Sequence, residues 1–178
     1  MKTNVALIGF MGSGKSAAGL MLAHKLDRSF IETDALIEER AGKSISAIFK
    51  QEGESHFRRL EHEVIAGAAR RDNAVIACGG GAVLNPANIE LLRRSSIIIY
   101  LEAAPSVIMR RLAAGGNKRP LLDVPDRAAR VRSMLEERKP LYERAADIKI
   151  NATHLSMEAL AELIMRELSR YDSKDSQE

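Results

Sequence analysis

A glycine-rich octapeptide near the start of the chain carries the residues best suited to phosphate chemistry. Gly9-Phe10-Met11-Gly12-Ser13-Gly14-Lys15-Ser16 fits the P-loop pattern G-x-x-x-x-G-K-S/T. In this pattern backbone N–H groups surround the phosphates of a nucleotide, the lysine reaches the β- and γ-phosphates, and the serine hydroxyl binds Mg²⁺. The sequence therefore predicts an ATP site with Mg²⁺ on Ser16, and the predicted nucleotide-binding residues here are Gly12, Ser13, Gly14, Lys15, Ser16 and Ala17.

A pair of acidic residues follows the next apolar stretch, in the segment Glu32-Thr33-Asp34. Glu32 is placed to hold Mg²⁺ through water, together with Ser16. Asp34 is placed to orient an acceptor hydroxyl or to accept its proton, so we predict that Asp34 and Lys15 are catalytic. A structural interpretation of Asp34 stays equally open, because aspartate is also a preferred N-cap of a following helix.

The remaining candidates are basic residues and glycines, and each has a structural alternative. Arg58 and Glu61 are spaced as a solvent-exposed ion pair on a helix, which the residues favour on their own. Gly79-Gly80-Gly81 lets the backbone approach a ligand, but it also suits a plain turn. Arg119 lies in a segment bounded by Gly and Pro, where it is either a lid arginine or an exposed charge. Arg138 suits the last turn of a helix, where a cation favours the helix dipole.

The elements that must position these residues alternate between apolar, strand-like runs and helical patterns. Predicted strands cover residues 4–8, 30–34, 75–78, 96–101 and 147–150. Predicted helices cover about 15–26, 34–41, 44–51, 54–71, 86–92, 105–112, 126–138 and 156–170. This alternation predicts βαβ units and a parallel sheet. Ligands of such sheets bind outside the carboxyl ends of the strands, where the P-loop, the acidic pair and the glycines all fall.

The composition is that of an ordinary globular protein. Of 178 residues, 46% are hydrophobic and 29% are charged, which predicts one domain over residues 1–170 with a polar tail over 171–178. No apolar run is long enough to span a bilayer, and the first strand begins too early for a signal peptide. The single cysteine, Cys78, excludes an internal disulfide and fits a core position in a cytoplasmic protein.

The charge balance bears on the partner. The net charge is +3 and the aromatic content is only 4%, and no nucleic-acid-binding motif is present. These features favour an anionic small molecule over a nucleic acid. We predict no nucleic-acid partner and no membrane association.

Taken together and in order, six segments resemble the shikimate kinase family. They are G-F-M-G-S-G-K-S, E-T-D, F-R-R-L-E, G-G-G, R-P-L-L and R-K-P-L-Y, and the resemblance covers about residues 4–168. It implies a three-layer α/β/α P-loop kinase fold of the nucleoside-monophosphate-kinase type, with a five-stranded parallel sheet in the order 2-3-1-4-5. It also implies a monomer that transfers the ATP γ-phosphoryl group to the 3-hydroxyl of shikimate, a step toward chorismate and the aromatic amino acids.

The resemblance also implies roles for individual residues. The residues implied to bind shikimate are Asp34, Phe57, Arg58, Gly79, Gly80, Gly81 and Arg138. Arg58 and Arg138 would clamp the substrate carboxylate, because the planar guanidinium matches its geometry. Arg119 would be the catalytic lid arginine and Arg111 would pack on the adenine side, so both would contact the nucleotide. The shikimate-binding segment would be about 34–61 and the lid about 113–124.

One residue departs from the family pattern, which usually reads D-T-D or D-x-D where this chain has Glu32-Thr33-Asp34. Glu32 keeps the charge but is one methylene longer, which puts the placement of Mg²⁺ in question.

Two alternative functions stay open. A gluconate kinase shares the P-loop, although Arg58, the three glycines and Arg138 argue against it. A non-catalytic ATP-binding module is favoured only by Glu32.

Overall fold

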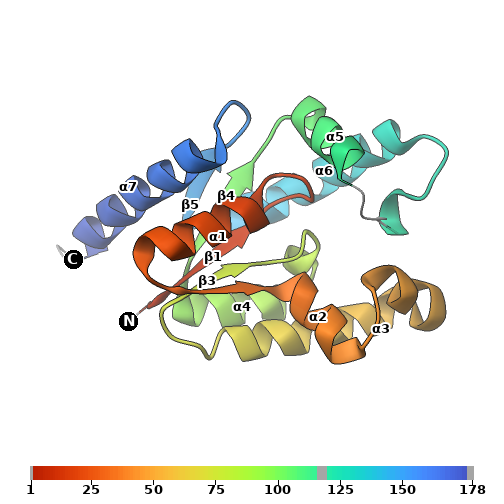
Figure 1. Cartoon of the computed structure of the whole chain (residues 1–178), viewed down its shortest axis with the longest axis horizontal. Helices are drawn as coiled ribbons and strands as arrows, with labels where there is room; N and C mark the ends of the chain where they lie inside the picture. The colour runs from red at the N-terminus through yellow and green to blue at the C-terminus, as the bar shows by residue number, and fades with distance from the viewer. Residues whose placement is uncertain (1, 116–119, 176–178) are drawn as a thin grey trace.

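The computed structural model describes residues 2–115 and 120–175, and its centre is a parallel sheet of five strands in the order β2-β3-β1-β4-β5 (Figure 1). This confirms the predicted fold class and strand order. The strands are β1 (Asn4–Ile8), β2 (Ser29–Glu32), β3 (Ala74–Ala77), β4 (Ser96–Glu102) and β5 (Ile148–Asn151).

Helices cover both faces of the sheet. They are α1 (Lys15–Leu26), α2 (Thr33–Ala41), α3 (Ile45–Ala68), α4 (Pro86–Ser95), α5 (Pro105–Ala114), α6 (Arg127–Ala145) and α7 (Met157–Asp175), with 3₁₀ turns η1 (Ala82–Leu84) and η2 (Pro120–Leu122). Figure 1 shows both ends of the chain on the left, while the strands run toward the right, where the P-loop joins α1. No helix in residues 2–115 or 120–175 is long and apolar enough to cross a membrane.

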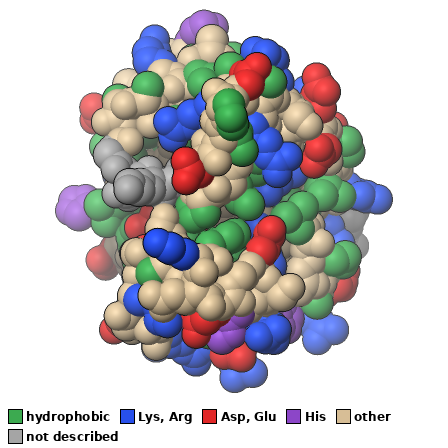
Figure 2. Space-filling view, turned by 90° about the vertical axis from the view of Figure 1, so that its right-hand side faces the viewer, with side chains coloured by type: hydrophobic (Ala, Val, Ile, Leu, Met, Phe, Trp, Pro, Cys, Tyr) green, Lys and Arg blue, Asp and Glu red, His purple; other side chains and the backbone are tan. Residues whose placement is uncertain are grey.

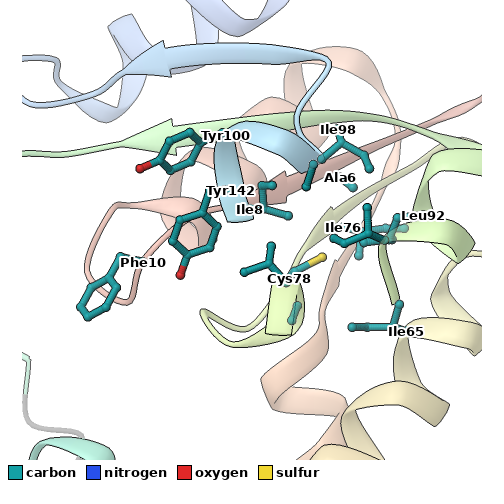
Figure 3. Close-up of a cluster of buried hydrophobic side chains, with 14 of the residues drawn as sticks. Ala6, Ile8, Phe10, Ile65, Ile76, Cys78, Leu92, Ile98, Tyr100 and Tyr142 are labelled. Atoms are coloured by element: carbon teal, nitrogen blue, oxygen red, sulfur yellow. The ribbon is translucent and has the colours of Figure 1, made fainter. Parts of the chain in front are cut away.

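Two clusters of buried side chains hold the layers together, one on each face of the sheet. Successive strand residues point to opposite faces, so Val5 and Leu7 pack with α1 and α7, whereas Ala6 and Ile8 pack with α3, α4 and α6. Figure 3 shows the second cluster, in which Tyr142 of α6 lies close to Tyr100 of β4. A third, smaller cluster joins α2 to α3, and its fully buried members are Ile37, Ile48, Phe57 and Val64.

Glycine and serine residues mark the boundaries of α2 and α3. Gly42 ends α2 in the left-handed conformation, with φ of 64°, and Ser44 accepts a hydrogen bond from the Ala47 N–H as the N-cap of α3. The two helices expected on either side of Gly53 form one element with a kink there, where φ is 82°. The kink turns the first part of α3 so that Ile48 can reach the third cluster.

The second strand is shorter than predicted, and this places Asp34 differently. β2 ends at Glu32, so Thr33 and Asp34 lie in the first turn of α2. Glu32 occupies the N-cap position, without a side-chain cap hydrogen bond. The interpretation of Asp34 as an N-cap is therefore wrong.

The last two helices extend further than predicted. α6 continues through Pro140 to Ala145 instead of ending at 138, and α7 reaches Asp175, inside the predicted polar tail. A proline inside a helix normally costs about 3 kcal/mol. Here Arg138, Tyr142 and Ala145 are all buried against the body of the protein, so tertiary packing outweighs the local cost.

Candidate active site

A cavity of about 530 Å³ opens at the carboxyl ends of the strands, between the P-loop and the α2–α3 region. Figure 2 views the molecule from this side, where hydrophobic side chains and charges of both signs surround the middle of the face. Its lining residues come from segments far apart in the sequence, and those with charged or glycine character are Glu32, Asp34, Glu38, Arg58, Glu61, Gly79, Gly80, Gly81 and Arg138. The predicted acceptor residues are thus brought together.

The P-loop forms one wall and is built largely from its backbone. Gly12 and Gly14 have φ of 79° and 102°, a conformation that favours glycine, and Gly14 is the residue before α1 begins. The Lys15 ammonium donates hydrogen bonds to the carbonyl oxygens of Gly9 at 2.8 Å and Phe10 at 2.9 Å. A buried cation and the N-terminus of α1 therefore lie at the same place, as anion binding requires.

Arg111 of α5 supports this loop from outside. Its Nη1 donates to the carbonyl oxygens of Gly12 at 3.2 Å and Ser13 at 3.0 Å. Burial, and then the charge of Arg110, lower the pKa of Arg111. The structure thus places Arg111 against the backbone of the phosphate-binding loop, next to the predicted nucleotide.

The two predicted metal-binding residues are in direct contact. The Ser16 hydroxyl, at the start of α1, donates a hydrogen bond to Glu32 Oε1, at the end of β2. Paired hydroxyl and carboxylate oxygens suit Mg²⁺, which commonly uses few protein ligands and completes its shell with water and phosphate. Within the described ranges there is no group of three or more His, Cys, Asp or Glu residues that could hold a metal ion.

Asp34 lies against the glycine turn that follows β3. A methyl group on Gly79 would come 2.6 Å from Asp34 Oδ1 and 3.1 Å from Glu61 Oε1. The Gly79 N–H also donates to Thr33 Oγ1 at 2.9 Å. Only glycine therefore lets the turn approach both carboxylates, and Thr33 fixes the distance between the turn and α2.

Arg58 is held by two carboxylates of its own helix. Its Nη1 lies 2.8 Å from Glu61 Oε2 and its Nη2 lies 3.0 Å from Glu54 Oε1. Glu61 is only 1% exposed, so the expected solvent-exposed pair is wrong: one partner is buried under the cavity. Gly81 packs directly on the guanidinium, where a Cβ atom would overlap it.

The ionisation of this pair follows from its burial. Desolvation raises the pKa of Glu61, with the charge of Arg58 opposing it. Desolvation alone would lower the pKa of Arg58, but the charges of Glu61 and Glu54 and the hydrogen bonds to them raise it overall. Arg58 therefore stays cationic and oriented toward the cavity.

Arg138 supplies a second guanidinium to the same cavity. It is 5% exposed, and its Nη1 has no hydrogen-bond partner among the described residues. Its Cζ atom lies 5.9 Å from the centre of the Phe10 ring, beside the P-loop. Since α6 continues well past this residue, the interpretation of Arg138 as a last-turn charge is wrong. A buried guanidinium that keeps one nitrogen, Nη1, free of hydrogen bonds to the described residues at a cavity wall suits an anionic ligand.

Some residues of the site were not predicted from the sequence. Glu61 and Tyr142 follow Arg58 and Arg138 at helical spacings, which was the available signal, and the apolar wall adds Phe49, whose ring centre is 4.9 Å from that of Phe57. Arg119 lies outside the described residues. Two pieces of the predicted lid are described: residues 113–115, at the end of α5, and residues 120–124, which include η2. Pro120 and Leu121 line the cavity.

The chain is similar to known proteins over most of its length. A family model described as "Shikimate kinase" matches residues 11–169. A shikimate kinase of Symbiobacterium thermophilum is 45% identical over 93% of this chain and 95% of that protein, and one of Caldanaerobacter subterraneus subsp. tengcongensis is 46% identical over 92% and 94%. The solved structure of a shikimate kinase from Acinetobacter baumannii in complex with shikimate superposes with a TM-score of 0.92, at 34% identity, over 96% of this chain and 95% of that one.

Proposed function

The chain belongs to the shikimate kinase family, and we propose that it transfers the γ-phosphoryl group of ATP to the 3-hydroxyl of shikimate at the site described above. The observation that carries this proposal is the pairing of Arg58 and Arg138 with Asp34 around one cavity that borders the P-loop. Shikimate offers one carboxylate and three hydroxyls, which match two guanidinium groups and a hydroxyl-binding carboxylate.

The donor side binds the phosphates of ATP. Gly12 to Ser16 present backbone N–H groups at the start of α1, and Lys15 adds a charge held by the Gly9 and Phe10 carbonyls. Fixed donors of this kind stabilise negative charge as the phosphoryl group moves, and they need no rearrangement at that moment. Arg111 keeps the loop in shape, and Arg119 would close over the γ-phosphate.

Mg²⁺ is part of this proposal, with Ser16 as a direct ligand and Glu32 acting through water. When bound, the ion would neutralise charge on the β- and γ-phosphates. The Ser16–Glu32 contact supports the assignment because both oxygens already lie at one point. The longer side chain of Glu32 spans the gap between β2 and α1 in this chain.

The acceptor side orients shikimate. Arg58 and Arg138 bind the carboxylate, and Phe57 with the glycine turn limits the position of the ring. Asp34 accepts a hydrogen bond from the 3-hydroxyl and takes its proton as the oxygen attacks the γ-phosphorus. Proximity and orientation supply much of the rate in such reactions, since phosphoryl transfer needs little covalent help from the protein. Closure of the lid excludes water, which would otherwise compete for the phosphoryl group.

The proposal extends to the whole chain as a monomer in the cytoplasm. Residues 1–170 would act as one domain, with the shikimate-binding segment at about 34–61 and the lid at about 113–124. Two features support this. All five strands belong to one sheet, and the single cysteine, Cys78, is buried at the end of β3, where desolvation raises the pKa of its thiol to about 12.

A coupled assay of ADP release tests the function directly. The purified full chain, with ATP and Mg²⁺, should release ADP only when shikimate is added, and gluconate should give no increase over background. Turnover of gluconate alone would replace the proposal with a gluconate kinase. Shikimate binding detected by calorimetry without any turnover would instead identify a non-catalytic ATP-binding module.

A further inference from the structure

The hydroxyl of Tyr142 bonds to the glycine turn of the acceptor site. It donates to the Gly80 carbonyl oxygen at 2.6 Å, across 62 positions of the sequence. The tyrosine is fully buried, and its ring stacks on Tyr100 with centres 5.0 Å apart and planes 20° apart. Figure 3 shows the two rings side by side, with Phe10 of the P-loop nearby. The ring is therefore held by packing, and its hydroxyl has a fixed target.

The same hydroxyl interacts with Arg138, which lies one turn earlier on α6. Burial raises the pKa of the Tyr142 phenol, whereas the charge of Arg138 and a side-chain hydrogen bond from it act in the opposite direction. A phenol oxygen can donate one hydrogen bond and accept others. It can therefore donate to Gly80 and accept from Arg138 at once, which leaves Arg138 Nη1 without a partner in the described chain.

Both groups on this hydroxyl line the cavity, on the two sides that shikimate would contact. On its other side the glycine turn is held to α2, because the Gly79 N–H donates a hydrogen bond to Thr33 Oγ1. The Tyr142 hydroxyl adds a direct hydrogen bond between the turn and α6 to the apolar packing of α6 on η1. Its loss would let the turn and the arginine adopt different relative positions while the aromatic stack remained.

We propose that Tyr142 is a positioning residue for the acceptor: through its hydroxyl it sets the distance between the glycine turn and the Arg138 guanidinium. This inference rests on the proposed function, because it assigns the two positioned groups to shikimate. It predicts a defect confined to the acceptor side, since the P-loop and Lys15 make their hydrogen bonds without Tyr142.

Tyr142→Phe removes the hydroxyl and keeps the ring. We expect the KM for shikimate to rise about tenfold, which corresponds to the loss of one well-placed hydrogen bond, with the KM for ATP unchanged. Tyr100→Phe is the matched control, because it removes the hydroxyl of the other ring in the stack, which makes no hydrogen bond within the described residues; its KM values should match wild type. An unchanged shikimate KM in Tyr142→Phe, or equal losses for both substrates, would overturn the inference.

A second measurement uses the wild-type chain and does not depend on how the variant folds. The protein has three tyrosines, so ¹³Cζ-tyrosine labelling gives three resonances, assigned by single Tyr→Phe variants. Shikimate should shift the Tyr142 signal, because Arg138 is engaged by the carboxylate, whereas ADP alone should leave it in place. A Tyr142 chemical shift that stays the same when shikimate binds would contradict the inference. Absence of any shikimate binding or turnover by wild type contradicts the proposed function instead.

Discussion

The donor and acceptor halves of the site are built from different materials. The P-loop half consists of consecutive residues, and its groups are mostly backbone N–H and C=O, with Lys15 bonded to the loop's own carbonyls. The acceptor half consists of charged side chains from α2, α3 and α6 around a glycine turn. A backbone site binds what every nucleotide shares, whereas a site of buried side chains can select one acceptor.

The two halves also differ in how their charges are supported. Lys15 donates hydrogen bonds to carbonyl oxygens of the loop that contains it, whereas Arg58 is paired with Glu61, a carboxylate that is almost fully buried. Burying a charge is costly unless it is paired. The acceptor half is therefore the part in which single substitutions should alter both binding and stability, and the halves meet where the Gly80 backbone approaches the Met11 N–H.

The largest expected effect is on kcat and comes from Asp34, whose substitution should impair turnover without weakening ATP binding. Asp34→Asn keeps the shape of the side chain but removes the proton acceptor, so kcat should fall about 10²- to 10⁴-fold, measured by ADP release at saturating shikimate. The affinity for ATP, measured by calorimetry, should stay near that of wild type. Lys15→Ala is the contrasting variant, because it should weaken both ATP binding and turnover. Normal turnover in Asp34→Asn would remove this residue from the catalytic role.

The next effect tests how closely the glycine turn fits the acceptor arginine. Gly81 has φ of −94°, which alanine adopts without strain, but its Cβ atom would overlap the Arg58 guanidinium. Gly81→Ala should therefore displace Arg58 and raise the KM for shikimate by about tenfold or more, with little change for ATP. Gly67→Ala is the matched control, because a Cβ atom at this position of α3 meets nothing within 4 Å. Its KM values for shikimate and ATP should equal those of wild type. An unchanged KM for shikimate in Gly81→Ala would show that Arg58 does not bind the substrate from its present position.

These residues also show what could be predicted from the sequence. The P-loop could be recognised because its groups are contiguous and each has its own position in the pattern. The buried state of Glu61 could not, since its spacing from Arg58 is equally typical of an exposed helix pair and only the packing of α3 under the cavity decides. The extension of α6 past Pro140 could not be predicted either. Local propensity indicates that the helix ends before the proline, but burial of Tyr142 and Ala145 stabilises the helix as far as Ala145.

A smaller effect should appear in the pH dependence of stability. Burial raises the pKa of Glu61 above its ordinary value of 4.5, so the folded protein binds a proton there more tightly than the unfolded chain does. This contribution to stability is complete below pH 4.5 and is lost as the pH rises through the raised pKa. Glu61→Gln does not titrate, so the free energy of unfolding of wild type, relative to this variant, should decline across that window in urea titrations.

Glu54→Gln serves as the control for that titration. It removes the other carboxylate bonded to Arg58, at a position where the side chain is 49% exposed. Its free energy of unfolding should differ from wild type by less than about 1 kcal/mol. A wild-type-minus-Glu61→Gln difference that stays flat from pH 4 upward would mean that the buried carboxylate is not the origin of the effect.

The smallest effect concerns Glu32, which connects the halves. Glu32→Asp restores the usual family residue but shortens the side chain that reaches Ser16. If Glu32 meets Mg²⁺ through water, one methylene less should leave the Mg²⁺ concentration for half-maximal rate within about threefold of wild type, because a bridging water can take up the change. The Mg²⁺-dependence of ATP affinity, measured by calorimetry without shikimate, should shift as little. A large loss in both measurements would show that the P-loop and β2 have adapted to glutamate, and that the donor half is not as self-contained as its backbone suggests.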